Sequence, residues 1–67
     1  MYRIKEEVSV EIKSKYKQKY IANALGMSQV YISELLNRKL ACPKLTAYAF
    51  TKIIDMEAEI LDFFEVA

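Results

Sequence analysis

With 67 residues, 54% of them hydrophobic and 28% charged, the chain has the size and composition of one domain with one small core. One cysteine, one glycine, one proline and no histidine exclude an intramolecular disulfide, leave a structural zinc site without its ligands and exclude low-complexity sequence. Residues 1–52 hold ten basic and four acidic residues (net +6), whereas residues 53–67 hold five acidic and no basic ones (net −5), which predicts a basic working face and an acidic tail.

The N-terminal segment carries two competing patterns. Ile4, Val8 and Ile12 recur every four residues, as on one face of a helix. Residues 8–13 instead alternate with period two and are rich in β-branched side chains, which is typical of a strand. We predict a helix over about 3–14, because no other segment offers a clear second strand, and the strand remains the alternative.

Two short helices joined by a tight turn are predicted in the centre of the chain. The first covers residues 17–24 and is followed by Gly26, which closes a helix in the left-handed conformation without a Cβ clash. Ser28 then serves as the N-cap of a helix over residues 29–37. The inner face of this helix comprises Ile32, Leu35 and Leu36.

Two further helices are predicted in the C-terminal third. Pro43 suits the start of a helix over about 44–54, and a fifth helix begins at Asp55 or Glu57. The side chains expected to point inward from the fourth helix are Leu45, Tyr48, Ala49, Phe50 and Ile53, and the apolar residues of the fifth are Ile60, Leu61, Phe63 and Phe64. The chain is therefore expected to be all-α, with four or five short helices.

The outward positions of the helix over 29–37 are suited to reading bases in a DNA major groove. Gln29 can pair with adenine, Val30 can contact a thymine methyl group, and Glu34 can accept from the cytosine amino group. Ser33 shares this face. The residues expected beside the phosphate backbone are Lys17, Gln18, Lys19, Ser28, Asn37, Arg38 and Lys39.

The run from Gln18 to about Leu45 resembles the helix-turn-helix of the Cro and phage-repressor family. The matching residues are Gln18, Ile21-Ala22, Leu25-Gly26, Ser28, Ile32-Ser33, Leu35, Asn37 and Pro43. The resemblance implies a compact lambda-repressor-like domain that binds double-stranded operator DNA in the cytoplasm of a bacterial host, usually as a homodimer. It places Gln29, Val30 and Glu34 where base-reading residues sit, and Gln18, Asn37 and Lys39 where phosphate contacts are made.

The sequence also supports a protein-binding alternative. It departs from the family pattern at Glu11, at the glycine-free segment 15–17 and at Glu34, an acid within the reading helix. Two adjacent phenylalanines cannot both face one small core, so one is expected to be exposed. The predicted protein interface comprises Glu57, Ile60, Phe63 and Phe64. Its partner is either a second copy of the chain or a repressor protein, which the chain would then modulate as an antirepressor.

Other classes of protein fit the sequence poorly. There is no signal-peptide pattern and no apolar run near the roughly 20 residues of a membrane span, so we expect an intracellular protein with no membrane partner. The chain has no histidine, no glycine-rich phosphate loop and little volume for a pocket, so we expect neither an enzyme nor a cofactor-binding protein.

Overall fold

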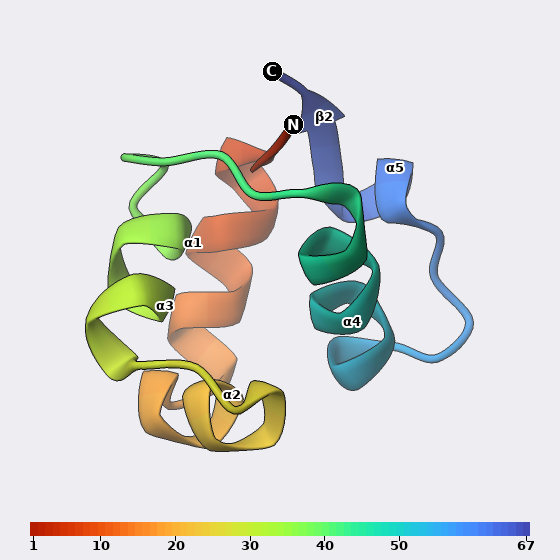
Figure 1. Cartoon of the computed structure of the whole chain (residues 1–67). Coiled ribbons are helices and arrows are strands. Elements are labelled where there is room, and N and C mark those ends of the chain that lie inside the picture. The colour runs from red at the N-terminus through yellow and green to blue at the C-terminus, as the bar shows by residue number, and fades with distance from the viewer.

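The computed structural model describes all 67 residues as five helices and a small two-stranded sheet (Figure 1). In chain order the elements are β1 (Tyr2–Ile4), α1 (Glu6–Lys15), α2 (Gln18–Leu25), α3 (Gln29–Leu36), α4 (Lys44–Ile54), α5 (Ile60–Phe63) and β2 (Phe64–Val66). The expected helical class is correct for most of the chain, but the sheet was not foreseen. None of the helices combines the length and the apolar character needed to cross a membrane.

The sheet joins the two ends of the chain. β1 and β2 are antiparallel, with Ile4 opposite Phe64 and Arg3 opposite Glu65, and the backbone N–H of Ala67 donates to the Met1 carbonyl at 3.0 Å. The predicted helix over 3–14 is therefore wrong at its start, because residues 2–4 pair with a strand about sixty residues further along. Residues 8–13 are helical throughout.

Helix α1 buries one narrow face. Ser9 and Ile12 are buried, and the Ser9 hydroxyl donates to the Glu6 carbonyl at 2.8 Å, which satisfies a polar group inside the core. Val10 is 60% exposed. The alternation of β-branched residues in this segment therefore does not correspond to two faces of a strand.

The turn between α2 and α3 follows from two residues. Gly26 has a φ of 68°, and the N–H of the next residue, Met27, donates to the Ala22 carbonyl at 2.9 Å, as in a Schellman motif. No atom lies within 4 Å of where a Cβ on Gly26 would stand, so the backbone angle is what favours glycine here. The Ser28 hydroxyl accepts from the Tyr31 N–H at 3.0 Å, which confirms the predicted N-cap.

Helix α4 has the predicted bounds but a different inner face. Its buried residues are Ala47, Phe50 and Thr51, and the Thr51 hydroxyl donates to the Ala47 carbonyl at 2.8 Å. Leu45 and Tyr48 were expected in the core, yet they are 78% and 50% exposed. The face centred on 47, 50 and 51 is the one that meets the rest of the core, and this turns Leu45 and Tyr48 toward solvent.

The C-terminal segment differs most from expectation. Its helix is a single turn, α5, capped by Glu59 and Asp62, and the chain then extends into β2. Phe64 is fully buried in an edge-to-face contact with Phe50, their ring centroids 5.5 Å apart, while Phe63 is half-buried. Phe64 is therefore a core residue, and its assignment to a protein interface is wrong.

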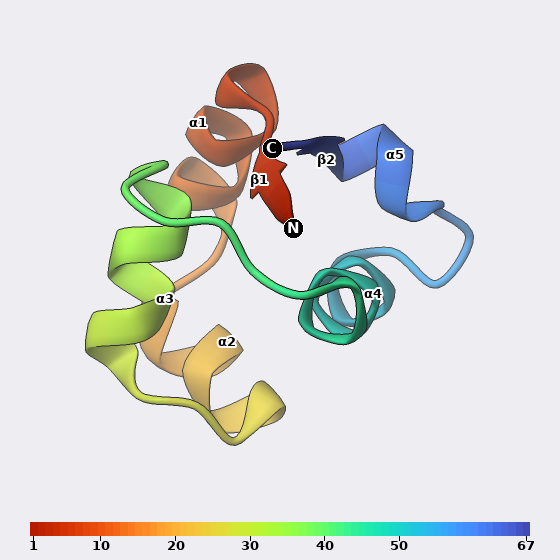
Figure 2. The same ribbon diagram turned by 45° about the horizontal axis from the view of Figure 1, so that its top comes forward.

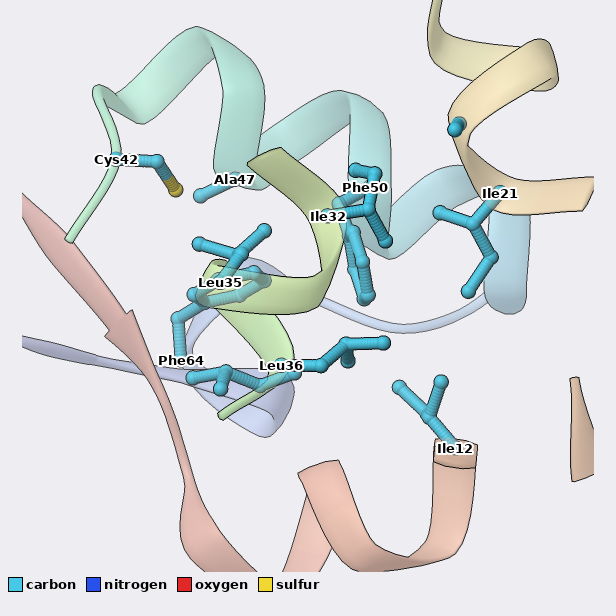
Figure 3. Packing of buried hydrophobic residues seen from close by; sticks show 11 residues of the cluster. Ile12, Ile21, Ile32, Leu35, Leu36, Cys42, Ala47, Phe50 and Phe64 are labelled. Atoms are coloured by element: carbon cyan, nitrogen blue, oxygen red, sulfur yellow. The ribbon is translucent and has the colours of Figure 1, made fainter. Parts of the chain in front are cut away.

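One core serves the whole molecule (Figure 3). Ile12, Ile21, Ile32 and Leu35 point into this core from α1, α2 and α3, and Phe50 enters it from α4. All elements except α5 contribute; the remaining members of the cluster are Ile4, Ala22, Leu36, Cys42, Ala47 and Phe64. The burial of Ile32, Leu35 and Leu36 confirms the predicted inner face of α3 and leaves its opposite face to solvent.

Candidate nucleic-acid interface

The outer face of α3 presents most of the residues that were predicted to read bases. Gln29, Glu34 and Asn37 are exposed, Val30 is 70% exposed, and Ser33 is half-buried. Because the helix packs through the opposite side, Gln29, Val30 and Glu34 are open to solvent, whereas Asn37 at the end of this face is bonded to Lys13 of α1. The face offers amide, hydroxyl, carboxylate and apolar groups within two helical turns, the mixture that base edges can discriminate.

The N-termini of α2 and α3 add unpaired backbone donors. Neither helix has an acidic residue in its first turn. In α2 the first N–H groups bonded within the helix are those of Tyr20 and Ile21, which both donate to the Lys17 carbonyl, and Lys17 provides no side-chain cap. The N–H groups of Gln18 and Lys19 therefore point along the positive end of the helix dipole, where an anion is favoured.

The amide of Asn37 is held by a chain of hydrogen bonds across two helices. The Lys13 ammonium donates to Asn37 Oδ1 at 3.0 Å, and Asn37 Nδ2 donates to the Ser33 hydroxyl at 3.4 Å. Lys13 belongs to α1 and was not among the predicted contacts. Its position next to Asn37 joins residues 24 apart in sequence, and no local pattern could have revealed it. The Ser33 hydroxyl, as an acceptor from Asn37, keeps its own hydrogen for a further acceptor.

Arg38 does not lie where a phosphate contact was expected. Its Nε donates to the Ile4 carbonyl at 2.9 Å, and its Nη2 donates to the Glu65 carboxylate at 2.7 Å. Nη1 lies 3.9 Å from the Glu6 carboxylate. The guanidinium is committed to the sheet and to two acidic side chains, so Arg38 is corrected from a phosphate contact to a structural residue.

The remaining lysines of this region are available. Lys17, Lys19 and Lys39 are exposed, and none of them forms an ion pair within the chain. Gln18 is half-buried at the first position of α2. Because Arg38 is paired with carboxylates, the unpaired cations of the α2–α3 region are these three lysines and Lys13. Glu34 is the only acidic residue of this region.

The charge asymmetry of the sequence becomes a separation in space. The five acidic residues after position 52 lie on the loop after α4, on α5 and on β2, and α5 lies on the opposite side of the molecule from α3 in both ribbon views (Figures 1 and 2). A polyanion approaching α3 therefore meets lysines first. Among the C-terminal carboxylates, Glu65 lies at the end of α3, where it is paired with Arg38.

Two ionisable side chains, the Cys42 thiol and the Tyr31 hydroxyl, are held in their neutral forms. Burial raises the pKa of the Cys42 thiol, and burial together with the proximity of Cys42 raises the pKa of the Tyr31 hydroxyl. Cys42 is fully buried beside β1, and its backbone N–H and C=O both pair with Tyr2. A protonated, buried thiol is a poor nucleophile, so Cys42 acts as a packing residue.

Comparison with known proteins adds no assignment. No model of a protein family, no curated protein and no solved structure matches the chain. The functional argument therefore depends on the residues and their geometry.

Proposed function

We propose that this chain is a small transcription regulator of the helix-turn-helix type, which places α3 in the major groove of operator DNA in a bacterial cytoplasm. The observation that carries the proposal is the exposed, mixed polar and apolar face of α3, packed through its other side against α2 across a glycine turn. Two short helices in this relation are a common way to hold a reading helix against a duplex.

The proposed contacts divide into two groups. Gln29, Val30, Ser33 and Glu34 face the base edges, with Gln29 closest to the helix N-terminus. The phosphate contacts come from Lys17, Lys19, Lys39, the free N–H groups at the start of α2, and the side chains of Gln18, Ser28 and Asn37. Compared with the phosphate contacts expected from the sequence, this set omits Arg38 and adds the backbone N–H groups of Gln18 and Lys19.

The alternative, a modulator that binds a repressor protein, is less well supported. It required an acidic helix with one exposed phenylalanine, whereas α5 has four residues, Phe64 is buried and Phe63 is half-buried. Glu34 at the centre of the α3 face remains the feature that favours this second candidate, because a carboxylate near DNA is costly unless it meets a donor. DNA binding explains more of the exposed surface, and we prefer it.

A salt titration tests the proposal directly. Binding to a pool of random duplexes is measured by fluorescence anisotropy at increasing salt, and bound duplexes are then selected and sequenced. Phosphate contacts from the three lysines should give an affinity that falls roughly as the third power of salt concentration, with an enriched sequence motif. Absence of any complex at micromolar protein in low salt would overturn the proposal, and so would an affinity independent of salt.

A further inference from the structure

A polar hollow of about 330 Å³ lies between α1 and the C-terminal end of α3. Lys13, Asn37 and Arg38 are among the residues that line it, and both ribbon views show the end of α3 beside α1 (Figures 1 and 2). Arg38 is committed to the sheet. Lys13 forms no ion pair, and the only bond of its ammonium is the one to Asn37 Oδ1 at 3.0 Å. A lysine with no carboxylate partner is therefore bonded to a neutral amide on the proposed DNA-binding face.

The bond from Lys13 fixes the direction of the hydrogen bond that follows it. An ammonium group can only donate, so the atom of Asn37 that faces Lys13 is the carbonyl oxygen. The amide nitrogen Nδ2 then faces the Ser33 hydroxyl, 3.4 Å away, and donates to it. Asn37 keeps its second N–H and Ser33 keeps its O–H, so each of the two side chains is left with one hydrogen to donate.

The Ser33 hydroxyl is not used by its own helix. Serine and threonine hydroxyls in helices often donate to a backbone carbonyl three or four residues earlier, and Ser9, Ser14 and Thr51 do so in this chain. Ser33 makes no such bond, and its side chain is bonded only to Asn37, from which it accepts. The hydroxyl hydrogen of Ser33 is therefore free for an acceptor outside the chain.

The Lys13 ammonium excludes the opposite orientation of the Asn37 amide. Rotation of the amide by half a turn exchanges its oxygen and its nitrogen. Oδ1 would then accept the Ser33 hydrogen, and the two side chains would satisfy each other. Lys13 would face an N–H₂ group, and two donors cannot bond to each other. Because a phosphate oxygen only accepts hydrogen bonds, the orientation that Lys13 imposes is the one that suits a DNA backbone.

We propose that Lys13 is a positioning residue for DNA binding, which acts through Asn37. It holds the amide so that Asn37 donates to a phosphate and the Ser33 hydroxyl donates to an acceptor on a base edge. This inference rests on the proposed function, and it adds a contribution from α1, which lies outside the two helices joined by the glycine turn. The base that Ser33 meets is then one with an acceptor in the major groove, such as the N7 of a purine or the O4 of thymine.

A double-mutant cycle measures whether Lys13 acts through Asn37. Affinity for the selected duplex is measured by fluorescence anisotropy for Lys13→Met, Asn37→Ala and the double variant. Lys13→Met should weaken binding roughly three- to tenfold, as for a lost hydrogen bond, and should have no further effect in the Asn37→Ala background. The slope of log affinity against log salt should change by much less than the roughly 1 that a lysine–phosphate contact contributes. Lys13→Arg, whose guanidinium also only donates, should keep the wild-type affinity.

Lys15→Met is the matched control. Lys15 is an exposed lysine of the same helix, and its ammonium contacts Glu11 and not α3. The variant should bind as tightly as the wild type. Repeating the selection of random duplexes with Ser33→Ala identifies the base pair that Ser33 reads, and Lys13→Met should relax the preference at that same pair. Circular dichroism checks that each variant is folded.

Three results would overturn this inference and leave DNA binding in place. The first is a Lys13→Met variant that binds the selected duplex as tightly as the wild type, or no more weakly than Lys15→Met does. The second is a loss of the same size with and without the Asn37 side chain and a salt slope lower by about 1, which would make Lys13 a phosphate contact in its own right. The third is an unchanged preference at the base pair that Ser33 reads. A wild-type chain that selects no duplex would instead overturn the proposed function, and this inference with it.

Discussion

Arg38 occupies a backbone conformation that glycine usually provides. Its φ is 61°, and it stands after the end of α3 where the N–H groups of Arg38 and Lys39 donate to the carbonyls of Leu35 and Glu34. This is again a Schellman motif, and a side chain there costs about 1–2 kcal/mol. The guanidinium offsets this cost through its bonds to the Ile4 carbonyl and to Glu65. Arg38 thereby ties the end of the proposed reading helix to both strands.

The two contributions of Arg38 can be separated by substitution. Arg38→Ala loses the guanidinium contacts and keeps the backbone strain, so we expect it to lower the free energy of unfolding by about 2 kcal/mol. Arg38→Gly loses the same contacts but relieves the strain, so its loss should be about 1 kcal/mol smaller. Urea unfolding followed by circular dichroism measures both. Lys39→Ala, an exposed neighbour without an ion pair, is the control. An alanine variant as stable as the wild type would mean that the guanidinium contacts contribute nothing.

Gln29 is the residue at which base reading is tested most directly. It is exposed at the first position of α3. Gln29→Ala should cost about 1–3 kcal/mol at one base pair of the selected sequence and relax the preference there. Binding of the variant to a set of single-base operator variants, measured by anisotropy, gives the position. A loss of the same size on every sequence would show that Gln29 contacts the backbone and not a base.

At the scale of elements, the parts of the fold that could be predicted depend on local chemistry. Gly26, Ser28 and Pro43 mark the ends of helices through interactions within a few residues, and the structure has each helix boundary there within one residue of expectation. Strands β1 and β2 depend on each other across the whole chain and have three residues each, so neither carries a periodic signal of its own. The partners of Arg38, Ile4 and Glu65, are also distant in sequence, so no local pattern indicated that its guanidinium is bonded within the chain.

The same limit applies to the faces of the helices. The inner face of α3 follows from the spacing of Ile32, Leu35 and Leu36, which is unambiguous. Helix α4 is apolar on several sides, and which side is buried depends on the neighbours it meets. Leu45 and Tyr48 were therefore misplaced. The exposed positions of the candidate site on α3 could be predicted, while the bond from Lys13 to Asn37 could not.

The strand residue Phe64 should carry much of the stability of the C-terminal segment. Phe64→Ala removes a fully buried ring that packs on Phe50, and we expect a loss of about 3–5 kcal/mol, comparable to the whole stability of a domain of this size. Thermal unfolding by calorimetry measures the effect. Val66→Ala, in the same strand but 72% exposed, should change the stability little. If both variants melt together near the wild-type temperature, the strand is not part of the core.

At the scale of the whole molecule, the separation of charge orients the chain on a polyanion. Lys17→Ala, Lys19→Ala and Lys39→Ala should each reduce the slope of log affinity against log salt by about 1. Lys52→Ala is the matched control, because the Lys52 ammonium donates to the carbonyls of Met56 and Ala58 on the acidic side of the fold. It should leave the slope unchanged. Equal slopes for all four variants would mean that DNA is not bound through α2 and α3.

The pairing of β1 with β2 has a consequence for the order of events in folding. Helices α2 and α3 meet across a short turn and can form early, whereas Ile4 and Phe64 come together only when the intervening chain has been closed into a loop. We expect substitutions in the α2–α3 contact, such as Leu35→Ala, to slow folding, and Phe64→Leu to speed unfolding instead. Stopped-flow chevron plots distinguish the two. The sheet would then be the last part of the molecule to form and the first to open.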